Sequence, residues 1–152
     1  MTTTLLKKHL YEACVQFVTS KLKTIQDTIQ SNQEALDSES KSSAGDKHET
    51  GRAMLQLEME KAGQQLQEVQ IMKLIVEKID FNSNSKAGSL GALIRTEGAN
   101  YFIGISVGKV QVEKESYFVV SPSSPIGKHL LGKLKNDTFF FQGAQTKILE
   151  IF

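Results

Sequence analysis

Apolar residues in the first 80 positions recur every three or four residues, and this spacing places them on one face of a helix. One such stripe consists of Leu6, Leu10, Cys14, Phe17, Val18, Leu22, Ile25, Ile29 and Leu36. A second consists of Leu55, Met59, Ala62, Leu66, Val69, Met72, Val76 and Ile79. The second stripe approaches the three–four alternation of a coiled-coil seam. The pattern predicts two long amphipathic helices that pack on each other along these stripes.

The stretch between the two stripes, residues 37–51, is polar and rich in helix-breaking residues. It reads Asp-Ser-Glu-Ser-Lys-Ser-Ser-Ala-Gly-Asp-Lys-His-Glu-Thr-Gly. Such a composition is typical of a turn. We therefore predict that residues 1–80 form an antiparallel helical hairpin with its tip at about residues 37–51. A helix of about 33 residues is roughly 50 Å long, so we expect the hairpin to project.

The periodicity changes after Ile79. Residues 82–88, Asn-Ser-Asn-Ser-Lys-Ala-Gly, have the composition of a linker. Short runs of strand-forming residues follow, at 90–96, 101–105, 109–112, 116–120, 138–141 and 147–152. In the run Phe139-Phe140-Phe141, alternate residues are expected in the core. The pattern predicts that residues 81–152 form a small α+β domain around an antiparallel sheet.

One short helix is expected between the strands of the second domain. Ser124 suits the N-cap position, and Pro125 suits the first helical position. Gly132 suits the C-terminal end. Its apolar face would consist of Ile126, Leu130 and Leu131.

Composition narrows the class of protein. Hydrophobic residues make up 39% of the chain and charged residues 23%, as in a soluble globular protein. Residues 1–80 carry 10 Lys/Arg and 12 Asp/Glu, and residues 81–152 carry 8 and 5. Neither half is basic enough to indicate duplex binding or sequence-specific DNA recognition. With a single cysteine, no signal peptide and no stretch of roughly 20 apolar residues, a cytoplasmic protein without membrane contact is expected.

The predicted tip contains two acids, Asp46 and Glu49, and two interpretations of them stay open. Their spacing is that of a capping box, in which two side chains satisfy the amides that begin a helix. Alternatively, both carboxylates face outward and complete a Mg²⁺ site that a partner supplies, because Mg²⁺ prefers oxygen ligands. The two interpretations are compatible, since a cap would also fix the geometry of the acids. His48 between them is expected to be merely exposed.

Other candidate chemistry is weaker. Cys14 lies on the apolar stripe of the first helix and is expected to be a buried thiol. Gly88-Ser89-Leu90-Gly91 is interpreted as a turn that enters a strand, and no P-loop or dinucleotide-binding motif occurs.

Two segments together resemble a known family. Gly45-Asp46-Lys47-His48-Glu49-Thr50 matches in spacing the Gly-Asp-x-x-Glu-Asn sequence of a coiled-coil tip. Residues 124–127, Ser-Pro-Ile-Gly, lead to the turn Leu131-Gly132-Lys133, then to an acidic turn and two strands. In both respects the chain resembles the bacterial Gre transcript-cleavage factors, which join an N-terminal antiparallel coiled coil to an FKBP-like C-terminal domain.

The resemblance implies a transcription elongation factor that is not an enzyme on its own. The hairpin would enter the secondary channel of RNA polymerase, and Ser124, Pro125, Ile126 and Gly127 would contact the polymerase at its rim. Asp46 and Glu49 would help to hold the second Mg²⁺ of the polymerase active site, with no cofactor bound by the chain alone. Two-metal hydrolysis would then shorten the nascent RNA 3′ end of a backtracked complex.

Three alternatives remain. The tip acids are followed by Gly51-Arg52-Ala53, where the family commonly continues Ala-Glu-Tyr, so one alternative is a polymerase-binding regulator that occupies the channel without stimulating cleavage. A second is a prolyl isomerase or chaperone that uses the FKBP-like sheet, although the chain has no Trp for such a pocket. A third is a coiled-coil adaptor whose tip acids only cap a helix.

Overall fold

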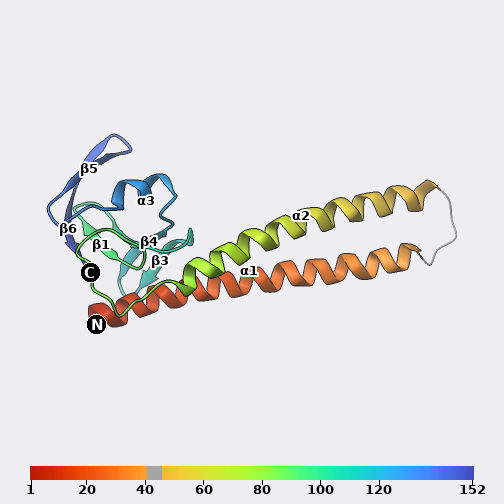
Figure 1. The fold of residues 1–152 in the computed structure, drawn as a ribbon, viewed down its shortest axis with the longest axis horizontal. Coiled ribbons are helices and arrows are strands. Elements are labelled where there is room, and N and C mark those ends of the chain that lie inside the picture. The colour runs from red at the N-terminus through yellow and green to blue at the C-terminus, as the bar shows by residue number, and fades with distance from the viewer. Residues whose placement is uncertain (41–45) are drawn as a thin grey trace. The chain divides into compact units, whose positions relative to one another are not determined.

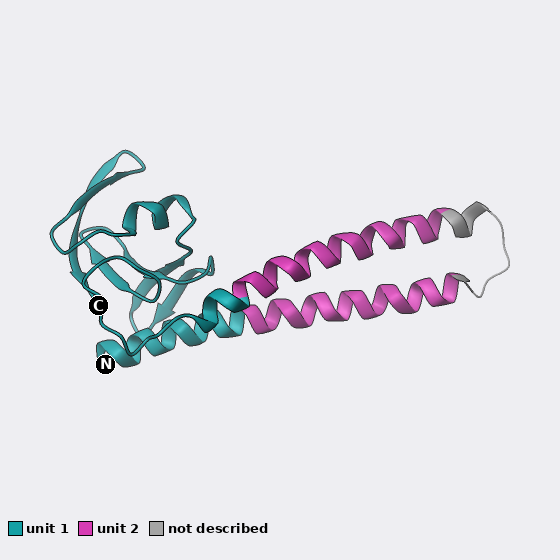
Figure 2. Ribbon diagram, viewed as in Figure 1, with its two compact units in different colours: residues 1–17, 73–152 teal, residues 18–72 magenta. Residues whose placement is uncertain are grey.

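The computed structural model describes the backbone of residues 1–40 and 46–152, and the side chains of residues 1–39 and 50–152. The chain forms two compact units (Figure 2). Residues 18–72 form one unit, here called the outer hairpin. Residues 1–17 and 73–152 form the other, here called the sheet unit.

Both predicted helices are present. Helix α1 spans Thr3–Ser40 and helix α2 spans Asp46–Glu77 (Figure 1). Each helix continues further toward the tip than the polar composition of residues 37–51 predicted. Serine is only a moderately poor helix former, and polar contacts one turn apart support the end of α1, such as the 3.5 Å hydrogen bond from Gln33 Nε2 to Asp37 Oδ1. The predicted turn is therefore too long at both ends.

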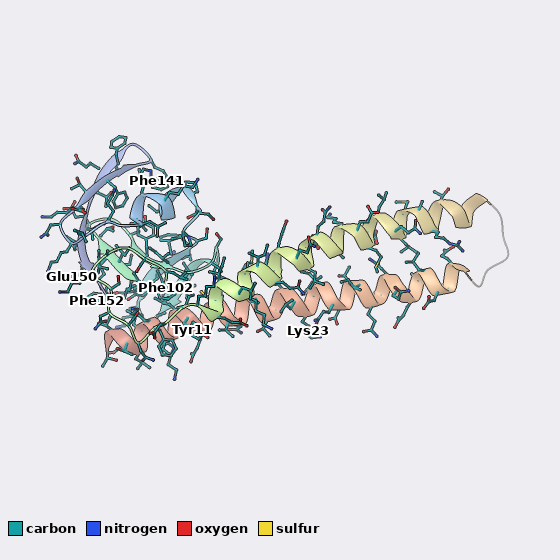
Figure 3. The ribbon with its side chains drawn as sticks, viewed as in Figure 1. Tyr11, Lys23, Phe102, Phe141, Glu150 and Phe152 are labelled. Atoms are coloured by element: carbon teal, nitrogen blue, oxygen red, sulfur yellow. The ribbon has the colours of Figure 1, made fainter. Side chains whose placement is uncertain are left out.

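The apolar stripes of the outer hairpin face inward, as predicted. Four of their residues are buried, namely Val18, Ile25, Ala62 and Val69. The remaining members of the stripes are half-buried: Leu22, Ile29, Leu36, Leu55, Met59, Leu66 and Met72. Lys23 extends from α1 on the side away from α2 (Figure 3) and pairs with Asp27 at 3.1 Å. The two helices thus share one seam and expose their polar faces.

All six predicted strands occur in the sheet unit. They are β1 (Leu93–Thr96), β2 (Asn100–Ile103), β3 (Gly108–Val112), β4 (Glu115–Val120), β5 (Thr138–Phe141) and β6 (Ala144–Ile151). The sheet has the order β3-β4-β2-β1-β6-β5. The pairing of β2 with β4 is parallel, so the sheet is mixed and the prediction of a wholly antiparallel sheet is corrected. The β3–β4 hairpin places β4, not β3, next to β2. Strand β4 therefore runs in the same direction as β2.

Side chains of the sheet alternate between two covered faces. One face packs against helix α3 (Pro125–Leu130) through a buried cluster: Ala92, Ile94, Ile103, Ile126, Leu130, Phe139 and Ile148. Leu93 and Phe102 alternate with these residues and are fully buried on the other face. There the first turns of α1 contribute Cys14, whose Sγ would lie 3.1 Å from a Cβ placed at Gly104. The sheet unit is therefore a three-layer core, and Phe102 lies inside it (Figure 3).

Helix α3 begins as its sequence predicted. The hydroxyl of Ser124 accepts a 3.1 Å hydrogen bond from the Gly127 amide and donates at 2.7 Å to the Ser121 carbonyl. Gly132 has a φ of 77° after the helix, the left-handed geometry that favours glycine there. Leu131 departs from the prediction, because it is the C-cap and 42% of it is exposed. The helix is too short to turn it back to the core.

The segment between α2 and β1 is tied down more firmly than its linker composition predicted. Lys7 of α1 is 1% exposed and donates a 2.6 Å hydrogen bond from Nζ to the Ser83 carbonyl. Burial lowers the pKa of Lys7, and the charge of Asp80 opposes this effect. Gly88 exchanges backbone hydrogen bonds of 2.8 Å with Lys133 and Gly132. These contacts anchor residues 80–88 within the sheet unit.

Candidate functional site

The predicted tip acids stand at the start of a helix. Helix α2 begins at Asp46, and Glu49 follows three residues later in its first turn. The side chains of Asp46, His48 and Glu49 lie outside the described residues, so their roles as cap or metal ligand stay predictions. The first amides of a helix lack acceptors within the helix and carry the positive end of its dipole. A carboxylate at either position is electrostatically favoured there.

A third carboxylate reaches this end of α2 from the other helix. A Cβ placed at Gly51 would lie 3.5 Å from Oε1 of Glu39, so the side chain of Glu39 crosses from α1 to α2 at this level. Arg52, the next residue, is exposed. The sequence gives no reason to single out Glu39 within a polar stretch, because the pairing of the two helices decides its position.

The predicted contact segment at residues 124–127 is mostly structural. Ile126 and Gly127 are buried, and Ser124 is half-buried by its role as the cap of α3. Pro125 alone among the four is exposed, followed on the same helix by Lys128 and His129. A Cβ at Gly127 would meet the Ser121 carbonyl at 1.9 Å, so this position requires glycine for packing. Only Pro125 offers a partner a free side chain.

A polar network that the sequence did not suggest lies on the sheet unit. Arg95 Nη1 contacts Glu115 Oε2 at 3.0 Å, and the Tyr117 hydroxyl donates to the same oxygen at 2.7 Å. These two hydrogen bonds, that of Tyr117 first, lower the pKa of Glu115. The three side chains border a groove of about 710 Å³ together with Met1, Leu6, Val112, Glu113 and Lys114. Arg95 and Glu115 are far apart in sequence, so no local motif could reveal the pair.

Two features of the described residues concern metal binding and membranes. No cluster of three or more His, Cys, Asp or Glu side chains suited to a metal ion occurs in the part of the chain that the structure describes. Among the same residues, neither long helix has an apolar stretch that could span a bilayer.

Comparison with known proteins gives a weak structural likeness. The chain matches no known protein family and no curated protein. Among solved structures, it is similar to that of the transcription factor Gfh1, with 17% sequence identity and a TM-score of 0.33, over 93% of this chain and 92% of that one. The family prediction therefore rests on the residues of the tip and of the α3 segment, within a fold of two long helices followed by an α+β domain.

Proposed function

We propose that this chain is a transcription elongation factor of the Gre type, which binds RNA polymerase and stimulates cleavage of backtracked RNA. One observation carries the proposal: α2 begins at Asp46. Both acids of the Gly-Asp-x-x-Glu motif therefore occupy the first helical turn at the closed end of an antiparallel hairpin. This is the position from which two carboxylates can be presented to another molecule.

The dimensions and chemistry of the hairpin suit this role. A helix of 32 residues, the length of α2, spans roughly 50 Å, enough to carry the tip deep into a channel. Asp46 and Glu49 are hard oxygen ligands, too few for a closed site but suited to complete one. A Mg²⁺ ion shared with the polymerase would supply the activation of water for hydrolysis. Asp46 and Glu49 would hold and orient it, and the polymerase would remain the catalyst.

The proposal is tested with a backtracked transcription complex, Mg²⁺ and labelled RNA. Changing Asp46→Asn together with Glu49→Gln is expected to slow cleavage about 100-fold, the upper range for lost metal-site partners. Binding to the polymerase is expected to persist, because the hairpin stays folded. The matched control, Asp27→Asn with Glu34→Gln, removes the same charges from the exposed face of α1. Undiminished cleavage by the tip variant would overturn the proposal.

One observation favours a second candidate, a regulator that occupies the channel without stimulating cleavage. Arg52 is exposed close to the start of α2. A cation near the two acids opposes the binding of a second cation by like-charge repulsion. This candidate predicts that the natural chain binds the polymerase and leaves the RNA uncut, whereas Arg52→Glu gains cleavage. A natural chain that cleaves as well as the Arg52→Glu variant would exclude it.

The contact of the sheet unit with the polymerase would use α3. Since Ile126 and Gly127 are buried, the contact falls to Pro125 and the exposed Lys128 beside it. Lys128→Glu is expected to weaken polymerase binding measurably, and Lys109→Glu on β3 serves as the matched control. Equal binding by both variants would remove α3 from the contact.

A further inference from the structure

The apolar stripe of α1 has a gap between Ile29 and Leu36, and a polar residue fills it. Asn32 lies three residues after Ile29 and four before Leu36, so it takes the seam position between them. It is 7% exposed. Its Nδ2 is buried and has no hydrogen-bond partner among the described residues. The seam therefore closes over the donor nitrogen of this side chain, which has no acceptor among the described residues.

Buried apolar side chains of the seam lie on one side of Asn32. Toward the sheet unit, Ile25, Ala62 and Val69 are 8%, 2% and 3% exposed and alternate with half-buried seam residues. Toward the tip, the apolar seam residues Leu36, Leu55 and Met59 are only half-buried. Among the described residues of this tip-side part, 33–39 and 50–59, no apolar side chain is buried, although they carry the same seam pattern.

These two features act in the same direction. A buried donor without a partner has lost its hydrogen bond to water and gained none, so closure of the seam at Asn32 is opposed. Helices of this kind gain most of their stability from the packing of an apolar face, and the tip-side part has little of it. Asn32 also lines a polar groove of about 350 Å³ with Thr24, Asp27, Thr28 and Ser31. Separation of the two helices at this level would expose Nδ2 to water.

We infer that Asn32 divides the outer hairpin into two cooperative parts. Residues 33–39 and 50–59 open locally while residues 18–31 and 62–72 stay packed. Opening solvates the Asn32 amide and releases only half-buried side chains, so it occurs far more often than unfolding of the whole hairpin. This local opening is a property of the chain alone and does not depend on the proposed function. If a partner binds the tip, local opening allows that end of the hairpin to change conformation while the rest stays packed.

Hydrogen exchange of the full chain, followed by mass spectrometry of peptides, tests the inference. In the natural chain, amides at 33–39 and 50–59 are expected to exchange at least about tenfold faster than those at 18–31 and 62–72, as separate opening units do. Asn32→Leu is expected to slow exchange of the tip-side amides about tenfold, because it removes an unpaired buried donor and adds apolar packing. Amides of the sheet unit are expected to keep their rates.

Two further variants keep the test decisive. Gln56→Leu makes a similar amide-to-leucine change at an exposed position of α2 within the same tip-side part, and it is expected to leave the tip-side rates unchanged. Asn32→Ala removes the donor without adding bulk, so it is expected to slow the same amides even if leucine fits the seam poorly. Uniform exchange along the natural hairpin would overturn the inference. So would equal slowing by the Gln56 and Asn32 variants, or slowing of the whole hairpin together.

Discussion

The outer hairpin and the sheet unit hold their shapes in different ways. In the sheet unit, Leu10, Phe102, Ile103, Leu130 and Ile148 are completely buried, because layers cover the sheet on both faces. In the outer hairpin, two helices cover each other along a single seam, and most seam residues stay half-buried. A contact between two layers buries fewer side chains than a core of three layers does. Side-chain packing therefore determines the structure of the sheet unit. The hairpin depends more on the continuity of its two helices, and it tolerates substitution of its side chains better.

The largest expected difference concerns core truncation. Phe102→Ala is expected to lower the free energy of unfolding by about 4 kcal/mol, since it leaves a cavity in a fully buried site. Leu66→Ala in the seam is expected to lower it by about 1 kcal/mol, because a half-exposed side chain loses less buried area. Urea denaturation followed by circular dichroism measures both. Equal losses would show that the two regions are packed alike.

The same substitution, glycine to alanine, is expected to have opposite effects on stability in the two units. Gly127→Ala would place Cβ 1.9 Å from the Ser121 carbonyl oxygen, and the forced backbone shift is expected to destabilise by about 3 kcal/mol. No atom lies within 4 Å of a Cβ added at Gly63 in α2. Gly63→Ala is therefore expected to stabilise by about 1 kcal/mol through helix propensity. Thermal melting should move in opposite directions for the two variants, and a shared direction would contradict the contrast.

A pair of serines gives a smaller effect. Ser124→Ala removes the cap of α3, with its 3.1 Å bond from the Gly127 amide, and is expected to destabilise by about 1 kcal/mol. Ser31→Ala replaces an exposed serine inside α1 by a better helix former and is expected to stabilise by about 0.5 kcal/mol. Chemical denaturation of the two variants side by side checks the signs. A neutral Ser124 variant would mean that the cap adds nothing to the core contacts of α3.

The smallest expected effect is the pH dependence of the contribution that Glu115 makes to stability. The pKa of Glu115 is lowered from its ordinary value of 4.5 by its hydrogen bonds with Tyr117 and Arg95. A carboxylate with a lowered folded-state pKa adds stability above its unfolded value and loses this contribution as pH falls through the folded value. The stability difference between the natural chain and Glu115→Gln should therefore shrink below pH 4.5. Melting temperatures between pH 3 and 7 measure it, with Glu113→Gln as the charge-matched control.

Local sequence patterns predict most of the elements, because each element is specified by residues close together in the chain. The three–four spacing gives both helices, strand-forming runs give all six strands, and Ser124 with Pro125 gives the start of α3. Phe139 and Phe141 pack with the core and Phe140 is 65% exposed, as the predicted alternation requires.

The missed features depend on partners that are distant in sequence. No residue pattern near β2 predicts its parallel pairing with β4, because this pairing depends on how the β3–β4 hairpin folds back onto the sheet. A buried Lys7 is unexpected, since lysine is rarely buried without a nearby acceptor, and its acceptor, the Ser83 carbonyl, is 76 residues away. Asn32 did leave a signal in the sequence, because the stripe steps seven residues from Ile29 to Leu36 instead of three or four.

The single cysteine turns the sheet unit into its own reporter. Cys14 is completely buried, and burial raises the pKa of its thiol to about 11 against a hydrogen bond with the Ile105 backbone. Because the thiolate is the reactive form, a thiol reagent at neutral pH reaches it only when the first turns of α1 leave the sheet. The labelling rate therefore counts openings of the sheet unit, with no engineered probe and no background from a second thiol. Hydrogen exchange in the outer hairpin and thiol labelling at Cys14 can be followed in one sample, and they report separately on opening of the hairpin and of the sheet unit.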